Sequence, residues 1–233
     1  MKILLLQHSA EDGPQRLGQW LTEAGATLDV RRLYDGDEIP SDTSGFDALV
    51  CLGGAMSAWD DETVDWLPAT KALLATAVTD KTPTLAICLG AQLLTLATGG
   101  MVEPGNRGPE YGAYLTAKRD AAERDPLFGW LPMTPDVMQS HADVITELPP
   151  DAVLLFAGTG YENQAFRVGE AAWGIQFHIE ADAETLRLWA AGKGSAARLG
   201  PALDEAAANM AEVWREFAHR FVTLRPRLPL IGS

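Results

Sequence analysis

The sequence predicts an α/β fold with a largely parallel central sheet. Two observations support this fold class: short apolar runs alternate with amphipathic stretches over the first hundred residues, and glycine or proline marks several of the ends of these runs. Strands that alternate with helices favour a parallel sheet covered by helices on both faces. With 233 residues, 47% of them hydrophobic, the chain is long enough to bury a large core.

The elements of the first half follow from this alternation. The apolar runs predict strands at residues 3–6, 27–33, 46–52 and 83–88. Helical spacing predicts helices at residues 14–25, 63–78 and 91–98. Glycine closes the first of these helices, and Gly99 and Gly100 stop the last one.

Beyond residue 100 the pattern changes to shorter runs with turn residues between them. Strands are predicted at residues 111–118, 136–140, 152–158, 163–168 and 172–177, and we expect the first four to form a small antiparallel extension of the parallel sheet. Helices are predicted at residues 182–191 and 201–221, with a flexible joint at 192–195.

These elements favour a single domain over residues 1–233. Residues 1–190 would form its core, and residues 195–233 a C-terminal helical appendage. That appendage could be a packing helix or a docking surface for a partner or a second copy of the chain, so a homodimer is one possibility. No internal repeat or low-complexity segment suggests another arrangement.

Composition and charge exclude several classes of protein. The formal net charge of −14, with no basic stretch to neutralise phosphates, disfavours nucleic-acid binding. The acidity indicates solubility, and the alternative is an acidic face that docks on a basic partner. Residues 82–102 carry no charge, but proline and glycine interrupt them, so we expect a buried strand–turn–helix segment and no membrane association.

The N-terminus and the cysteine count bear on where the protein works. The apolar run at residues 3–6 is too short for a secretory signal and lacks a small-residue cleavage site. Two cysteines form no disulfide framework. We therefore expect a cytoplasmic protein.

Cys88 is the candidate nucleophile. It stands where an apolar strand ends and a helix begins, in the run LAICLGAQ, and a strand-to-helix turn lifts a side chain above the sheet at a helix N-terminus. Small neighbours, Ala86 and Gly90, suit such a sharp and crowded turn. The helix dipole and the free amides favour the thiolate. Taken alone, an apolar cysteine is more often a small core residue.

His178 and Glu180 supply the base and the group that orients it. They follow a buried strand and stand two positions apart, which on an extended chain places both side chains on one face. The imidazole can accept the thiol proton while the carboxylate polarises the imidazole. A lone His-x-Glu is usually a surface pair, whereas a cysteine elbow followed by this pair is far more specific.

A glycine pair, Gly53-Gly54, follows the apolar run at residues 46–52. Such a pair permits an unusual backbone, so the Gly54 N–H could point at a bound carbonyl and form an oxyanion hole with the N–H of Leu89. The alternative is an ordinary turn, but open α/β sheets place their sites at the carboxyl ends of strands.

These pieces, in this order, resemble the class I glutamine amidotransferase family, most of all the glutaminase domain of GMP synthetase and its stand-alone relatives. The matching stretches are GGAMS at 53–57, CLGAQ at 88–92, EYG at 110–112, SHAD at 140–143 and QFHIE at 176–180. The resemblance covers residues 1 to about 190. It implies the flavodoxin-like fold of that family, a mixed, mostly parallel seven-stranded-type sheet between helices with a small antiparallel extension.

The resemblance also implies the chemistry. A Cys88–His178–Glu180 triad would form a thioester that water hydrolyses, releasing glutamate and ammonia, without a cofactor. Glutamine would be held by residues near the triad, namely Met56, Gln92, Ser140, His141, Ala142 and Asp143. Ala86, Ala55 and Ile179 stand where the family commonly has glycine, proline and proline. These departures affect the rigidity of the loops and remove no reacting group.

The remaining candidates have simpler roles. His8 and His219 have no partner nearby in the sequence and are expected to be structural or exposed, and Cys51 is expected in the core. Trp59 and Trp66 could line the mouth of the pocket, although packing is the simpler role. No cysteine or histidine spacing indicates a metal site, and no phosphate-binding loop is present.

Two substrate classes stay open for the enzyme. The domain could feed ammonia from glutamine to a separate synthetase, or work alone on γ-glutamyl compounds such as peptides. The chain could instead be a non-catalytic regulatory subunit that keeps the fold, or a different cysteine hydrolase of the same broad fold.

Overall fold

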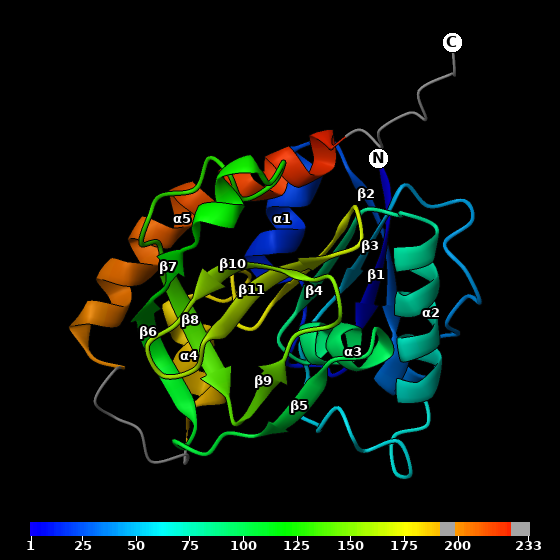
Figure 1. The fold of residues 1–233 in the computed structure, drawn as a ribbon, viewed down its shortest axis with the longest axis horizontal. Coiled ribbons are helices and arrows are strands. Elements are labelled where there is room, and N and C mark those ends of the chain that lie inside the picture. Colours follow the sequence, from blue (N-terminus) through cyan, green and yellow to red (C-terminus); the bar gives the residue numbers. More distant parts are fainter. Residues whose placement is uncertain (192–198, 225–233) are drawn as a thin grey trace.

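The computed structural model describes residues 1–191 and 199–224 and contains an eight-stranded sheet in the order β2-β1-β3-β4-β12-β11-β10-β7. The first five strands pair in parallel, and the last three continue the sheet antiparallel (Figure 1). Two separate two-stranded sheets, β5-β9 and β6-β8, accompany it. The mixed, mostly parallel sheet predicted from the sequence is confirmed.

The strands are β1 (Lys2–Gln7), β2 (Thr27–Arg32), β3 (Ala48–Cys51), β4 (Thr84–Ile87), β5 (Met101–Pro104), β6 (Glu110–Leu115), β7 (Ala117–Lys118), β8 (Asp136–His141), β9 (Asp143–Glu147), β10 (Val153–Ala157), β11 (Asn163–Val168) and β12 (Ala172–Ile175). The helices are α1 (Gln15–Glu23), α2 (Leu67–Thr79), α3 (Leu89–Ala97), α4 (Ala183–Trp189) and α5 (Pro201–Thr223), with 3-10 turns η1 (Leu33–Asp35) and η2 (Asp120–Arg124).

Helices cover the sheet on both faces. Along β1, Ile3 and Leu5 pack with residues of α1 and α5, whereas Leu4 and Leu6 pack with residues of α2 and α3. Figure 1 shows α1 beside α5 and α2 beside α3 accordingly. Because successive side chains of a strand point to opposite faces, a strand buried on both sides must be apolar throughout, which explains the continuous apolar runs.

Two predicted elements differ from the structure in their extent. The helix predicted at 63–78 begins at Leu67, because Pro68 lacks an N–H and fits only the first turn of a helix. The strand predicted at 111–118 is two strands, β6 and β7, separated at Thr116, whose N–H is donated to the Pro135 carbonyl.

The prediction that residues 111–118 and 136–140 extend the main sheet is wrong for most of these residues. β6 and β8 pair with each other in a separate sheet, and only the short β7 joins the main sheet, beside β10. The strands β5 and β9 were not predicted. The register between strands depends on contacts between distant segments, which short apolar runs do not specify.

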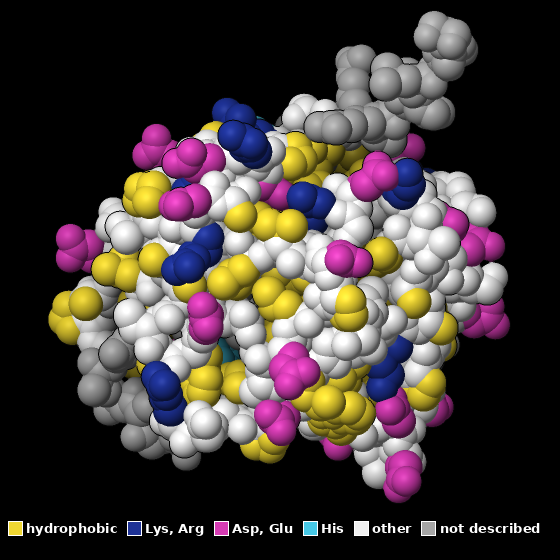
Figure 2. All heavy atoms as spheres, viewed as in Figure 1, with side chains coloured by type: hydrophobic (Ala, Val, Ile, Leu, Met, Phe, Trp, Pro, Cys, Tyr) yellow, Lys and Arg dark blue, Asp and Glu magenta, His cyan; other side chains and the backbone are white. Residues whose placement is uncertain are grey.

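The C-terminal helix predicted at 201–221 is confirmed as α5, and it packs on α1. The joint predicted at 192–195 lies outside the described residues. No helix in the described part of the chain is long and apolar enough to cross a membrane. On the face in Figure 2, acidic side chains are spread out and interspersed with basic ones.

Candidate active site

Cys88 occupies a strained turn between β4 and α3. Its φ and ψ are 50° and −108°, a region that L-residues rarely adopt, and its N–H is donated to the Ile175 carbonyl of β12 at 2.8 Å. Non-glycine residues persist in such conformations where the surrounding structure enforces them, often at active sites. This is the sharp strand-to-helix turn expected from the sequence.

Gly90 allows α3 to lie directly on β3. A Cβ atom at Gly90 would overlap the Cys51 carbonyl oxygen and stand 3.0 Å from the Leu52 carbonyl oxygen. Since both are backbone atoms, a side chain at this position would displace the helix. The crowding that the sequence suggested around the elbow is therefore present, and Gly90 relieves it.

His178 and Glu180 form a tight buried pair. His178 Nδ1 is 2.6 Å from Glu180 Oε1, and Glu180 Oε2 accepts the Ile179 N–H at 2.9 Å. The His178 N–H is donated to the Met138 carbonyl at 2.7 Å, which fixes the segment against β8. Burial by itself lowers the pKa of His178, but the neighbouring charges of Glu180 and Cys88 raise that pKa well above its ordinary value.

Cys88 and His178 share one pocket of about 270 Å³. His178 Nε2 is buried and has no hydrogen-bond partner within the described residues. A Cβ atom at Gly53 would be 3.2 Å from His178 Cε1 and 3.5 Å from Cys88 Cβ, so both side chains flank this glycine. Gly54 and Ser140 also line the pocket.

The glycine pair acts through close approach rather than through unusual torsion angles. Neither Gly53 nor Gly54 has a positive φ, so the unusual backbone expected from the sequence is not what requires glycine here. A Cβ at Gly54 would stand 2.8 Å from the Leu89 side chain, so the pair lets the segment pack against the start of α3. The Leu89 N–H belongs to the first turn of α3, where amides lack intrahelical partners and can serve an oxyanion.

The residues expected to bind substrate divide into two groups. Ser140 lines the pocket, and its carbonyl oxygen is 4.0 Å from Cys88 Sγ. The Gln92 amide is donated instead to the Asp143 carbonyl at 3.0 Å. The Asp143 carboxylate accepts the Ser57 hydroxyl at 2.8 Å, and neither Gln92 nor Asp143 is among the residues that line the pocket around Cys88.

The other predicted substrate contacts lie close to these hydrogen-bonded residues or to the glycine pair. His141 Nε2 is 3.1 Å from Glu110 Oε2, and its Nδ1 is 3.1 Å from the Asp143 carbonyl, which orients the turn after β8. Ala142 is exposed, and its carbonyl accepts the Gly105 N–H. Met56 is half-buried, and its sulfur lies against Gly54.

Sequence reasoning missed several residues around the nucleophile. Gln176, which precedes His178 by two positions on the same strand face, donates its amide to Cys88 Sγ at 3.8 Å. Alternation along the strand could have identified it. The pocket is also lined by residues that no local motif marks: Ser9, Glu11, Asp12 and Trp189. Residues 11–12 follow β1 at the carboxyl end of the parallel strands, where β4 also ends at Cys88. This position could have indicated that they lie near the nucleophile.

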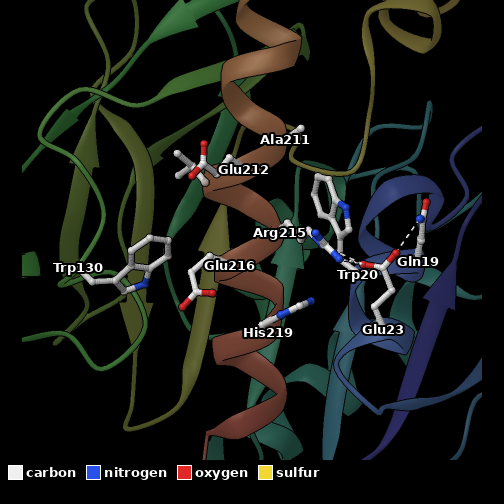
Figure 3. A pocket seen from close by; sticks show the side chains of 10 residues that line it. Gln19, Trp20, Glu23, Trp130, Ala211, Glu212, Arg215, Glu216 and His219 are labelled. Carbon is white, nitrogen blue, oxygen red and sulfur yellow. Dashed lines mark hydrogen bonds and ion pairs between the residues drawn. The ribbon is translucent and has the colours of Figure 1, made fainter.

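The remaining histidines and tryptophans considered from the sequence are not among the residues that line the pocket around Cys88. His8 is fully buried, with Nε2 3.4 Å from Cys51 Sγ, and its Nδ1 accepts the Trp66 indole N–H at 3.2 Å. Trp59 is exposed and donates to the Val102 carbonyl. His219 lines a larger pocket of about 840 Å³ between α1 and α5, which contains no residue of the predicted triad (Figure 3). Within residues 1–191 and 199–224, no cluster of three metal-ligating side chains occurs.

Comparison with known families shows which family the chain matches. Residues 15–187 match the model of a protein family described as glutamine amidotransferase class-I. The GMP synthase (glutamine-hydrolyzing) of Porphyromonas gingivalis is 33% identical over 181 residues, which are 77% of this chain and 33% of that protein. The chain therefore spans about one third of the length of this relative. Gamma-glutamyl peptidase 5 of Arabidopsis thaliana is 32% identical over 168 residues, 70% of this chain and 66% of that protein.

Solved structures show the same fold. A glutamine amidotransferase from Thermotoga maritima superposes with a TM-score of 0.82 at 27% identity, covering 95% of this chain and 98% of that one. Another from Methylobacillus flagellatus gives 0.84 at 26% identity, covering 100% and 98%. The family resemblance derived from the sequence motifs is thus confirmed.

Proposed function

This chain belongs to the class I glutamine amidotransferase family, and we propose that it hydrolyses a γ-glutamyl amide bond through Cys88. The observation that carries the proposal is the shared pocket, in which the strained Cys88 elbow meets an imidazole with a free Nε2 and a carboxylate on its other nitrogen. A nucleophile, a base and an orienting group in this arrangement suit covalent acyl transfer.

In the first step, His178 Nε2 takes the Cys88 proton and the sulfur attacks the amide carbon. The resulting oxyanion is stabilised by the Gly54 and Leu89 N–H groups. The carbon–nitrogen bond then breaks, its electron pair stays on nitrogen, and His178 returns the proton to the leaving amine. Glu180 stabilises the imidazolium in between.

In the second step, water attacks the Cys88 thioester. His178 accepts a proton from this water, and the thiol leaves as the carbon–sulfur bond breaks, giving the γ-carboxylate. Gln176 can support the departing thiolate, because its amide already donates to Cys88 Sγ. Ser57, Gln92 and His141 form hydrogen bonds to Asp143 and hold the turn that follows Ser140 of the pocket.

Two substrates fit this chemistry. L-Glutamine would give glutamate and ammonia, for use by a separate acceptor enzyme. A γ-glutamyl peptide or amide would give glutamate and a larger amine. The second is supported by the γ-glutamyl peptidases among the relatives, one of which, gamma-glutamyl peptidase 4 of Arabidopsis thaliana, is covered over 86% of its length.

The test is glutamate release from L-glutamine and from a panel of γ-glutamyl peptides. Cys88→Ala should abolish turnover, and Cys51→Ala, which changes the other buried cysteine, should retain it. A glutamine-analogue alkylating reagent should label the wild type at Cys88. Turnover that persists in Cys88→Ala would refute the proposed nucleophile. Absence of both turnover and labelling, with and without candidate synthetases, would favour a non-catalytic subunit.

A further inference from the structure

The pocket around Cys88 has an acidic and aromatic wall on the side of His178. Glu11 and Asp12, in the loop between β1 and α1, line it together with Trp189 of α4. The Trp189 and His178 rings lie 4.7 Å apart between centroids. The Arg16 N–H is donated to the Glu180 carbonyl at 3.2 Å, which holds the start of α1 against the segment that carries the base.

The two carboxylates form no ion pair with a lysine or arginine in the described part of the chain. The ion pairs found there include neither Glu11 nor Asp12. The nearby Arg16 is directed elsewhere: its guanidinium is 3.8 Å from Asp182 and donates to the Ala207 carbonyl. Burial raises the pKa of Asp12, while a hydrogen bond from Ser9 lowers it. The charge of His178 also lowers the pKa of Asp12, and no lysine or arginine among the described residues is ion-paired with the wall.

Acidic residues alone do not define a ligand site, but the imidazole of His178 beside them is a second indication of one. His178 Nε2 is buried, lacks a partner among the described residues and belongs to the same pocket. In the proposed function, on which this inference rests, this nitrogen protonates the leaving amine. A leaving nitrogen that faces His178 brings its substituent next to the residues that line the pocket on that side, Trp189 and Asp12.

We propose that this wall, made of Glu11, Asp12 and Trp189, binds the leaving group and selects γ-glutamyl amides whose amine part carries a second, positively charged group. Carboxylates pair with an ammonium group, and an indole face attracts a cation. The substrate class is a γ-glutamyl diamine or a similar cationic amide.

The experiment compares two substrates of nearly equal shape, γ-glutamyl-n-propylamide and γ-glutamyl-(2-aminoethyl)amide, which end in a methyl and an ammonium group. For the wild type we expect kcat/KM to be about tenfold higher for the cationic substrate. Asp12→Asn should reduce this ratio to about threefold or less. Because asparagine keeps the shape of the side chain, the variant isolates the charge.

Two comparisons make the result specific to the leaving group. Asp80→Asn removes the same charge from an exposed residue at the end of α2, at the opposite edge of the sheet, and should keep the wild-type ratio. L-Glutamine, whose leaving group is ammonia, measures any general effect of Asp12→Asn, and the loss of kcat/KM should be about threefold or more greater for the cationic substrate than for L-glutamine. Equal kcat/KM for both substrates in the wild type would overturn the proposal. So would an equal loss for all substrates in Asp12→Asn, which would assign Asp12 to the α-ammonium group of the glutamyl part.

A second measurement decides the inference even if no substrate is turned over. Cys88 is modified with cationic 2-aminoethyl methanethiosulfonate and with neutral methyl methanethiosulfonate, and Cys88→Ala corrects for reaction elsewhere. The cationic-to-neutral rate ratio should exceed that of a free thiol and fall severalfold in Asp12→Asn. A ratio unchanged by Asp12→Asn refutes the cation-binding wall, whereas absent turnover with a charge-dependent ratio refutes only the proposed hydrolysis.

Discussion

His8 should make the protein less stable in mildly acidic solution. The ring is fully buried, and desolvation lowers its pKa from 6.5 to about 4. Trp66 donates to Nδ1, so the neutral ring carries its hydrogen on Nε2 and donates it to Cys51. Protonation would remove the acceptor for Trp66 and place a charge among apolar neighbours.

The magnitude follows from proton linkage. Between pH 6.5 and 4 the unfolded chain binds a proton at His8 and the folded chain does not, so the free energy of unfolding falls as the pH falls. At 1.36 kcal/mol per pKa unit, this residue alone removes about 2 kcal/mol by pH 5 and about 3 kcal/mol by pH 4. Below pH 4 both states are protonated and the loss stops increasing.

Urea unfolding at several pH values between 7 and 4 measures this effect. His8→Gln should be less stable than the wild type at pH 7 but should lose about 2 kcal/mol less on going to pH 5. Trp66→Phe removes the indole donor and leaves the histidine buried, so it should keep the wild-type pH dependence. If His8→Gln loses as much stability as the wild type between pH 7 and 5, the inference that His8 is buried in its neutral form is wrong.

Two further predictions concern the elbow and the base. Glu180→Gln removes a charge that raises the pKa of His178, so the upper limb of the pH dependence of Cys88 alkylation should move to lower pH. The alkylation rate near neutral pH should fall about tenfold, as for loss of a charge-assisted hydrogen bond. Gly90→Ala places a methyl group on the Cys51 carbonyl and should cost about 2–3 kcal/mol in the free energy of unfolding, measured by urea denaturation.

Each of these has a matched control. Glu184→Gln removes a carboxylate from an exposed position in α4 and should leave the pH dependence of Cys88 alkylation unchanged. An equal shift in both variants would mean that the net charge of the protein, not the buried pair of His178 and Glu180, determines this pH dependence. Gly200→Ala adds a methyl group where no atom lies within 4 Å and should cost less than about 1 kcal/mol. A Gly90→Ala protein as stable as Gly200→Ala would contradict the close packing of α3 on β3.

The local sequence predicted most of the helices and strands, although not β5 and β9, and it identified the segments that carry the proposed reacting groups. Apolar runs predicted the parallel strands because burial on both faces leaves no place for polar residues. The elbow at Cys88 and the two-residue spacing of His178 and Glu180 are features of single short segments. Alternation along a strand therefore placed the last two on one face without knowledge of any neighbour.

Tertiary structure alone decided how distant segments meet. The strand order puts the loop after β1 and helix α4 around Cys88, which brings Asp12 and Trp189 into the pocket. It also directs Gln92 toward Asp143 and separates β6 and β8 from the main sheet. Short segments fix torsion angles and faces through local interactions, whereas pairing between segments far apart depends on contacts that form only in the complete fold.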